Sequence, residues 1–401
     1  MKQKVSTILA PLLCLAACGG SDTSGETPPT AIPAPAPSPA PTPTPTPSQG
    51  EGFTTTAVAT FDTPWAMTFI GNGPYALITE RGGNMFVVNT ATGAKSAVSG
   101  VPTPVVGGQG GLGDIVMAPD SDPSDNSYPV YLSWAEDGGG NTRGAVVARG
   151  TFTFNQGTGG NAAISALSII WRQEPTVTGT GHFSHRIAVA PDRQHIFITS
   201  GDRQKESPAQ DMAVNLGKVI RLKPDGSVPA DNPFASQSGV TAQIWSLGHR
   251  NLLGIAFDAS GRLWEAEMGP RGGDEVNLIQ RGANYGWPEA SNGSHYSGED
   301  IPDHTAGDGF TAPAVWWTPS ISPGSLTYYN ADLFPHWRNS LFVGALSGQA
   351  LIRLQINGDQ LSKADQWPMQ RIREVETGPD GALWLLEDGA GARLLKLTPS
   401  G

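Results

Sequence analysis

Residues 187–199 read IAVAPDRQHIFIT, an apolar β-rich run, a polar turn and a second apolar run. Two such runs that flank a short turn with Pro and Asp are typical of a β-hairpin. The chain repeats this pattern five more times, with paired runs at 66–69 and 77–79, 115–118 and 130–133, 255–258 and 263–265, 326–329 and 341–343, and 375 and 383–385. The pattern therefore indicates an internal repeat of hairpins.

Six copies of one hairpin predict an all-β fold built by radial repetition. A single small sheet cannot bury both of its faces, whereas a ring of sheets can. Long apolar runs with helical spacing are missing from the sequence, which argues against α/β and helical-repeat folds. We expect a six-bladed β-propeller of four-stranded antiparallel blades, and the alternative is a β-sandwich or barrel whose hairpins are alike by accident. In a propeller, loops at one face of the central channel form the ligand site.

The N-terminal segment does not belong to this repeat. Two lysines precede an apolar stretch from Val5 to Ala17, which is the order of a secretion signal and is too short for a transmembrane helix. The segment LAACG at 15–19 resembles the lipobox of bacterial lipoproteins. Cys18 is therefore the expected lipid anchor, and the alternative is a plain secretory signal cut near the same position.

These features divide the chain into a signal peptide with a lipobox (1–18), a Pro/Thr/Ser-rich linker (19–52) and a propeller catalytic domain (53–401). Proline favours extended, solvated chain, so the linker is expected to act as a semi-rigid spacer. We expect an exported lipoprotein that faces the periplasm. Gly19 is not the acidic residue associated with inner-membrane retention, which favours an outer-membrane anchor.

Charge and cysteine content exclude two kinds of chemistry. The chain carries a formal net charge of −11, and removal of the signal segment with its lysines makes it more acidic. The sequence lacks the clusters of basic residues that bind phosphate, so we do not expect a nucleic acid as a partner. Both cysteines, Cys14 and Cys18, lie in the N-terminal segment, so the domain has neither a disulfide nor a reactive thiol.

The glycine-rich segment GQGGLG at 108–113 fits the dinucleotide fingerprint G-x-G-x-x-G only formally. That fingerprint needs a helix after it, whereas a strand is expected to follow here. The glycines instead let the backbone approach a flat ligand, with Gln109 as its amide partner.

The segment GHFSHR at 181–186 places His182 at the mouth of an expected inner strand. Its unperturbed pKa of about 6.5 suits a general base, and the alternative is a hydrogen-bonded structural histidine. His185 is not expected to share a metal with His182, because residues three apart on an extended strand point to opposite faces.

Two further segments carry guanidinium groups. Arg250 and Asn251 lie together before the fourth repeat and offer donors for carboxylates or quinone oxygens, although a surface salt bridge is the alternative. Arg371 and Arg373 lie two residues apart, hence on one face of an extended segment. Two convergent arginines imply an anionic ligand, and the alternative is an edge strand defended by charge.

The densest polar region spans 264–275 and continues to 284–288. Its carboxylates and turn carbonyls are the oxygen ligands that calcium prefers, although the spacing is not that of an EF-hand. A solvated acidic loop is the alternative.

Taken in order, these segments resemble the soluble aldose sugar dehydrogenases that depend on pyrroloquinoline quinone (PQQ). The likeness runs from about Pro64 to Leu397. The matching segments are PWAM (64–67), TER (79–81), GQGGL (108–112), GDR (201–203), AQD (209–211), GKVIRL (217–222), PADNPF (229–234), GHRN (248–251), GP (269–270), DEVNLI (274–279), NYGWP (284–288) and RIR (371–373). The fold of that family is a six-bladed propeller, as the hairpin count predicts.

The resemblance implies oxidation of an aldose to its lactone, with hydride passing from the anomeric carbon to calcium-activated PQQ. His182 matches the catalytic base, and Arg250 matches the residue that bonds the quinone oxygen and stabilises developing negative charge. The residues that match cofactor contacts are Gln109, Arg250, Asn251, Ser320, Arg371 and Arg373. Gly269 and Pro270 match carbonyl ligands of the cofactor's calcium, while Glu275 and the carbonyl of Tyr285 match a second, structural calcium.

Two positions depart from the family pattern. Ser347 stands where glucose-oxidising relatives carry a lysine that pairs with the cofactor, and His185 replaces a small residue. Two alternatives therefore stand beside the PQQ enzyme. One is a metal-dependent sugar lactonase, against which the arginines argue, and the other is a non-catalytic propeller binding module, which Ser347 supports. The expected partners of the enzyme are an aldose and an electron acceptor such as a quinone, a cytochrome or a dye.

Overall fold

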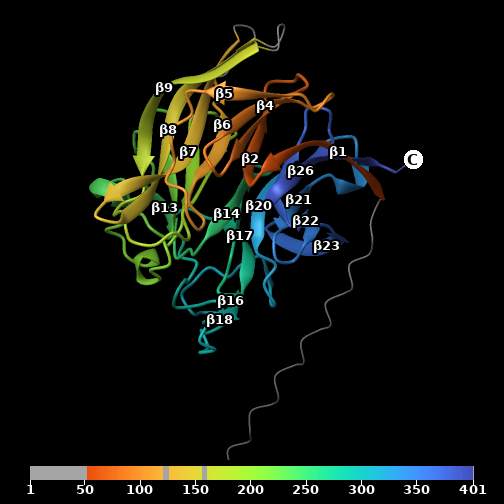
Figure 1. The fold of residues 1–401 in the computed structure, drawn as a ribbon. Helices are drawn as coiled ribbons and strands as arrows, with labels where there is room; N and C mark the ends of the chain where they lie inside the picture. Colours follow the sequence, from red (N-terminus) through yellow and green to blue (C-terminus); the bar gives the residue numbers. More distant parts are fainter. Residues whose placement is uncertain (1–51, 121–125, 156–159, 401) are drawn as a thin grey trace, which may run out of the picture. The chain divides into compact units, whose positions relative to one another are not determined.

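The computed structural model describes residues 52–120, 126–155 and 160–400 (Figure 1). The predicted signal segment, Cys18 and all of the predicted linker except Gly52 lie outside the described residues. The described part of the chain is all-β. Its helices are the short 3₁₀ turns η1 (Ser207–Ala209), η2 (Gly239–Gln243) and η3 (Pro335–Trp337). Within the described ranges, none of them is long or apolar enough to cross a membrane.

Four sheets contain four antiparallel strands each. The first contains, side by side, β10 (Ser184–Val189), β11 (Ile196–Ser200), β12 (Lys218–Leu222) and β13 (Ile244–Leu247). The second is ordered β14 (Leu252–Phe257), β15 (Leu263–Glu267), β17 (Asp274–Ile279) and β19 (Val315–Trp317). The third is ordered β20 (Pro323–Tyr329), β21 (Ser340–Ala345), β22 (Ala350–Asn357) and β23 (Gln360–Pro368). The fourth is ordered β1 (Phe53–Asp62), β26 (Ala390–Pro399), β25 (Leu383–Glu387) and β24 (Ile372–Thr377).

The remaining strands form one large and one small sheet. The large sheet has eight strands, in the order β2 (Pro64–Phe69), β3 (Tyr75–Glu80), β4 (Met85–Asn89), β5 (Lys95–Ser99), β9 (Gly160–Arg172), β8 (Thr142–Asn155), β7 (Ser127–Gly139) and β6 (Leu112–Met117). The small sheet pairs β16 (Arg271–Gly272) with β18 (Gly293–Ser294).

The six predicted hairpins are confirmed. Each is an antiparallel pair whose first member starts a sheet, and the pairs are β2/β3, β6/β7, β10/β11, β14/β15, β20/β21 and β24/β25. The alternation of β-branched runs with Pro, Asp and Gly turns is sufficient to set these local pairings.

The prediction of six four-stranded blades is confirmed only in part, because β2 to β9 form a single eight-stranded sheet. A parallel contact joins β5 to β9 through the pairs Val98–Ala162 and Ser99–Ala163. The strands β7, β8 and β9 are unusually long, with 13, 14 and 13 residues, so the first part of β9 reaches the free edge of β5.

The first strands of the hairpins contact one another in a closed circuit. The order is β2, β6, β10, β14, β20 and β24, and β24 returns to β2. The sheet of β24 is completed by both ends of the described chain, because β1 pairs with β26 from Phe53–Pro399 to Asp62–Ala390. The loops that precede the six innermost strands are therefore held around one axis.

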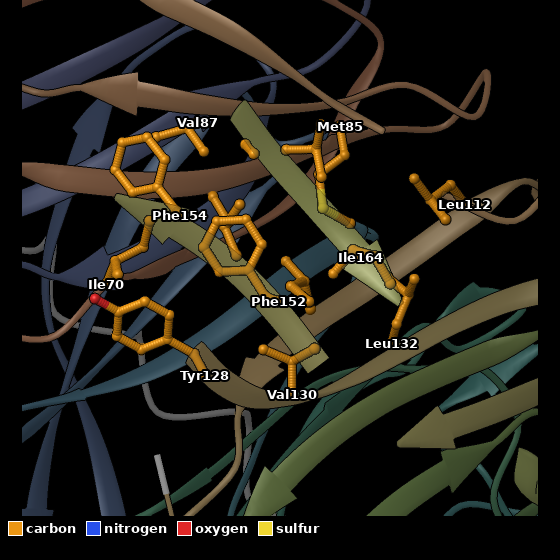
Figure 2. Packing of buried hydrophobic residues seen from close by; sticks show 14 of the residues in the cluster. Ile70, Met85, Val87, Leu112, Tyr128, Val130, Leu132, Phe152, Phe154 and Ile164 are labelled. Atoms are coloured by element: carbon orange, nitrogen blue, oxygen red, sulfur yellow. The ribbon is translucent and has the colours of Figure 1, made fainter. Parts of the chain in front are cut away.

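Apolar side chains fill the space between neighbouring sheets. Figure 2 shows the cluster inside the eight-stranded sheet, where Tyr128, Phe152 and Phe154 pack against Ile70 and Val87. The Phe152 ring lies 5.9 Å from that of Tyr128 and 6.1 Å from that of Phe154, measured between centroids. Burial of such aromatic side chains makes the scaffold rigid, and rigid strands hold the polar loops in place.

Candidate active site

The loops before the innermost strands line a cavity in two adjoining parts. One part, of about 650 Å³, is lined by residues that include Gln109, His182, Arg250, Gly269, Pro270, Ser320 and Ser347. The other part, of about 360 Å³, is lined by residues that include Gln109, Trp65, Leu253, Arg371 and Arg373. Both parts share Gln109, Met268 and Ser322. The structure thus brings together nearly all predicted base and cofactor residues.

His182 is paired with a buried carboxylate. Its Nδ1 lies 2.6 Å from Oδ1 of Asp202, which also accepts hydrogen bonds from the Gln204 amide and the Trp287 indole. Burial lowers the pKa of His182, against the opposing effect of Asp202. Burial works to raise the pKa of Asp202, but its hydrogen bonds hold that pKa below the usual value. At neutral pH the pair is therefore a neutral imidazole with an ionised carboxylate behind it.

This pairing leaves one face of the imidazole for chemistry. Because ionised Asp202 only accepts hydrogen bonds, Nδ1 of His182 carries the proton and Nε2 carries the lone pair. Nε2 has no hydrogen-bond partner among the residues that the structure describes, and His182 lines the cavity. His182 is thus set up as a general base.

The loop that holds His182 has an unusual backbone. His182, Ser184 and His185 all have positive φ, at 49°, 60° and 60°. The chain passes so close to Gly201 that a Cβ there would lie 2.2 Å from the His182 carbonyl oxygen. Arg203 fixes the same loop. Its guanidinium carbon lies 3.6 Å from the centre of the Phe183 ring, and its guanidinium donates to the carbonyls of residues 179 and 181. Such backbone conformations persist only where surrounding contacts impose them.

Arg250 reaches the cavity beside His182. Its Nη1 donates to the carbonyls of Met268 and Gly269 at 2.9 and 2.6 Å, and its Nη2 lies 3.4 Å from the Tyr296 hydroxyl. Its Nε is buried and has no partner in the described chain. An unpaired buried donor is costly, so Nε is suited to a ligand oxygen. Arg250 therefore fits the predicted contact with a quinone oxygen.

Arg371 and Arg373 share one carboxylate, as residues on one face of a strand can. Asp388 accepts two hydrogen bonds from Arg371 through Oδ2 and two from Arg373 through Oδ1, at 2.8–3.0 Å. Burial acts to raise the pKa of Asp388, but the two guanidinium groups lower it. The group keeps a net positive charge, which suits an anionic ligand.

Three other predicted cofactor contacts support the cavity in different ways. Gln109 accepts a hydrogen bond from the His182 amide through Oε1, so its Nε2 is directed elsewhere. Ser320 accepts the Gly272 amide through its hydroxyl. Asn251 is fully buried, where its side chain contacts Met268 and Ser184, two residues of the cavity lining.

Ser347, the departure from the family pattern, also lies at the cavity. Its hydroxyl is 2.7 Å from that of Ser322. Serine brings no positive charge to the position where the family resemblance predicts a lysine, so the positive charge on this side of the cavity comes from Arg371 and Arg373.

The four predicted calcium ligands lie in two places. Gly269 and Pro270 line the cavity, and the turn that they form is tied down by Asp274, which accepts the amides of Gly269, Ile321 and Ser322. The Gly269 carbonyl already accepts from Arg250, so a cation bound there requires that this guanidinium shift.

Glu275 and Tyr285 lie apart from the cavity lining, in a buried acidic cluster with His249, Glu265 and Glu267. Oxygen and nitrogen ligand atoms of His249, Glu265 and Glu267 lie within 4.8 Å of one another. Glu275 faces Glu267 across β15 and β17. Burial, reinforced by the charge of Glu267, raises the pKa of Glu265 and Glu275 well above the usual value.

Two oxygens of this cluster are orphaned. Oε1 of Glu265 and Oδ1 of Asn277 are buried and have no hydrogen-bond partner in the described residues. Crowded carboxylates with free oxygens are the donor set that a hard divalent cation needs. The residues therefore fit a structural calcium near Glu275, in a cluster that is larger than the predicted pair.

Sequence reasoning missed Asp202, Asp388 and Arg186, which act through the predicted residues. Asp202 belongs to the matched segment GDR. Nothing in that segment indicates that its carboxylate pairs with a histidine 20 residues away. Asp388 had no local signal at all. Arg186 follows the HFSH segment directly, and a charged residue within an otherwise apolar strand pattern was the available clue.

Comparisons with known proteins place the chain in a family. The glucose/sorbosone dehydrogenase family matches residues 61–396. The chain is 38% identical over 345 residues to aldose sugar dehydrogenase YliI of Escherichia coli, which covers 84% of this chain and 90% of the relative. It is 28% identical over 415 residues to quinoprotein glucose dehydrogenase B of Acinetobacter calcoaceticus, covering 80% and 84%.

Solved structures give the same result. The apo form of the soluble E. coli aldose sugar dehydrogenase superposes with a TM-score of 0.80 at 36% identity, covering 87% of this chain and all of the other. The PQQ-bound aldose sugar dehydrogenase of Streptomyces coelicolor superposes with a TM-score of 0.70 at 27% identity, covering 88% and 100%.

Proposed function

Because the chain belongs to the glucose/sorbosone dehydrogenase family, we propose that it oxidises aldose sugars to lactones with PQQ and calcium as cofactors. The observation that carries the proposal is a neutral, Asp202-bound His182 that opens on a cavity lined by five arginines, among them Arg250, Arg371 and Arg373. Arg250, Arg371 and Arg373 match a flat, polyanionic cofactor. An external electron acceptor, such as a quinone, a cytochrome or a dye, completes the cycle.

The residues present define the steps that the chain itself performs. Nε2 of His182 takes the proton of the anomeric hydroxyl, and Asp202 stabilises the imidazolium that forms. When bound, PQQ supplies the hydride acceptor, and calcium supplies a Lewis acid that polarises it. Arg250 would donate to the PQQ oxygen where negative charge develops. Arg371 and Arg373 would orient the PQQ carboxylates, and Gly269 and Pro270 would hold the calcium through their carbonyls.

The same proposal includes the finer architecture. The eight-stranded sheet counts as two four-stranded blades joined at their outer edges through β5 and β9, and four further sheets follow. Together with the closed circuit of innermost strands, this supports a six-bladed propeller. Glu275 and the Tyr285 carbonyl would hold a second calcium within the buried acidic cluster.

The lactonase alternative is less well supported. It requires carboxylates around a metal at the cavity, whereas the acidic carboxylates that the cavity presents, Asp274 and Asp388, are taken up by backbone amides and arginines. The binding-module hypothesis predicts the same cavity as the enzyme hypothesis. Only a measurement of turnover distinguishes the two.

Reconstitution tests the proposal. The purified chain is incubated with PQQ and calcium, and reduction of an artificial dye is measured with a panel of common aldoses. We expect PQQ-dependent turnover that is abolished in His182→Ala while PQQ absorbance changes on binding persist. Failure of every aldose would refute the activity, and lactone hydrolysis without PQQ would favour the lactonase. Binding of PQQ without turnover would favour the binding module.

We also propose that the protein is an exported lipoprotein, anchored through Cys18 and facing the periplasm, with the outer membrane favoured. Support comes from the sequence of residues 1–19 alone. Labelling with a radioactive fatty acid tests this, because Cys18→Ser should remove the label and release the protein from the membrane fraction. Equal labelling of both forms would contradict it.

A further inference from the structure

Arg186 crosses the axis of the ring of innermost strands. It belongs to β10, and its Nε and Nη2 donate at 2.8 Å to the carbonyls of Leu253 on β14 and Gly324 on β20. Its Nη1 is bonded to Glu374 on β24 and lies 3.6 Å from Asp114 on β6.

The sixth strand is reached through an aromatic ring. The guanidinium carbon lies 4.0 Å from the centre of the Trp65 ring on β2. One side chain, 5% exposed, thus contacts all five other innermost strands. A planar cation with five donors is the side chain that can serve so many acceptors at once.

Arg186 lies directly beneath the cofactor cavity. Trp65 and Leu253, which it contacts, line that cavity, and its Nη2 is 3.4 Å from the carbonyl of Arg373, another lining residue. Its charge also acts on the Arg373 guanidinium. A substitution at Arg186 therefore affects residues that line the cavity directly.

The surroundings of Arg186 are otherwise acidic. Asp114 from β6 and Glu374 and Glu376 from β24 lie near it, and the other titratable neighbours are Arg373 and His185. Among the described residues, the contacts of Arg186 with β2, β14 and β20 are the Trp65 indole and the carbonyls of Leu253 and Gly324. Burial raises the pKa of Glu374 to about 7, against the effect of Arg186. Arg186 lowers the pKa of all three carboxyl groups, so its loss would raise these pKa values further. At alkaline pH, the carboxylates that still ionise would then face an anionic ligand without a counter-charge.

We propose that Arg186 is a positioning residue for the cofactor: it fixes the innermost strands around the cavity and shields the bound anion from the carboxylates below. This inference rests on the proposed function, because the anion is PQQ. It goes beyond that function by assigning cofactor affinity to a side chain that does not line the cavity.

The test measures PQQ dissociation constants by absorbance titration of the full chain with calcium, at pH 9 and pH 5.5. Arg186→Met is expected to bind PQQ about tenfold more weakly at pH 9, where carboxylates near the cavity ionise, and to lose less at pH 5.5, where they are protonated. Arg186→Met/Glu374→Gln should recover about threefold of the loss at pH 9, because one uncompensated charge is removed. A purely structural role would lower the melting temperature without this pH dependence or recovery.

A matched control is Arg353→Met, which breaks the ion pair of the partly buried Arg353 with the buried Asp365 on the outer strands β22 and β23. It should lower stability and leave PQQ affinity unchanged. If Arg186→Met does not fold, Glu374→Gln alone is expected to bind PQQ about threefold more tightly at pH 9 and equally at pH 5.5.

Three results are decisive. Wild-type affinity in Arg186→Met at both pH values overturns the inference, and so does unchanged affinity of Glu374→Gln at both. A wild type that binds no PQQ overturns the proposed function first, and the inference with it.

Discussion

Asp202→Asn tests the catalytic pair most directly, because every contact of this carboxylate is with a donor. Oδ1 faces His182 Nδ1 and the Gln204 amide, while Oδ2 faces the Trp287 indole and the Glu206 amide, at 2.6–3.3 Å. An asparagine side chain has one acceptor oxygen and one NH2 group, which is a donor. In either orientation, the NH2 group would therefore face two other donors.

The two orientations have different costs. With the amide nitrogen at the Oδ1 position, His182 must accept there and carry its proton on Nε2, which removes the base. With the amide nitrogen at the Oδ2 position, two buried donors lose their acceptor, at about 1–3 kcal/mol each. In both cases the imidazolium loses its counter-charge, and a lost charge-assisted hydrogen bond of about 3 kcal/mol corresponds to about 150-fold.

We expect kcat to fall by about 10²–10³-fold, within the usual range for general-base catalysis. PQQ affinity and the KM for the sugar should change little, because Asp202 touches neither. The pH at which activity is half-maximal should also fall, since Asp202 raises the pKa of His182. Dye-linked steady-state kinetics from about pH 5 to 9, on enzyme saturated with PQQ and calcium, measures all of these quantities.

Asp192→Asn is the matched control. It makes the same change in a His–Asp pair of the same 2.6 Å length, at His195 on another turn, where the aspartate is exposed rather than buried. A kcat for Asp202→Asn within threefold of the Asp192→Asn value, in a folded protein, would refute the reasoning.

Three further outcomes are expected. Arg373→Met should raise the PQQ dissociation constant about 30-fold or more because the Arg373 side chain is only 14% exposed, whereas Arg371→Met, with a side chain 46% exposed, should raise it less than about tenfold. Titrations that give equal losses would contradict this. Glu275→Gln should abolish the rise in melting temperature on adding calcium yet melt higher than wild type in chelator, because it relieves buried repulsion. Burial lowers the pKa of His185 to about 3, so the free energy of unfolding should fall from pH 6.5 towards 3 by up to about 1.4 kcal/mol per pH unit, and His185→Gln should show a shallower slope in urea denaturation.

The sequence allowed the hairpins to be predicted, because alternation and turn chemistry are local. It did not show that β9 would reach β5, since that contact joins residues 64 positions apart, Val98 and Ala162, without any local signal. The single glycine Gly113 illustrates the same limit: a Cβ there would lie 2.0 Å from the His185 ring, so one position makes room for another on a different strand.

The site divides in the same way. Residues with a distinctive segment around them, such as His182 and Arg250, could be predicted from the sequence, and the structure brings them to the same cavity. Their partners Asp202 and Glu267 became visible only when the strands were placed side by side, because a hydrogen bond across 17 or 20 residues leaves no periodic trace. The wider acidic cluster around Glu275 was missed for the same reason.

The pairing of β1 with β26 makes the last folded sheet depend on both ends of the domain. A polypeptide that is still being synthesised holds β1 but lacks its partner strand until residues 390–399 emerge. Ring closure must then come last, after synthesis of the entire domain, and a chain that stops short would present an unpaired edge to its neighbours.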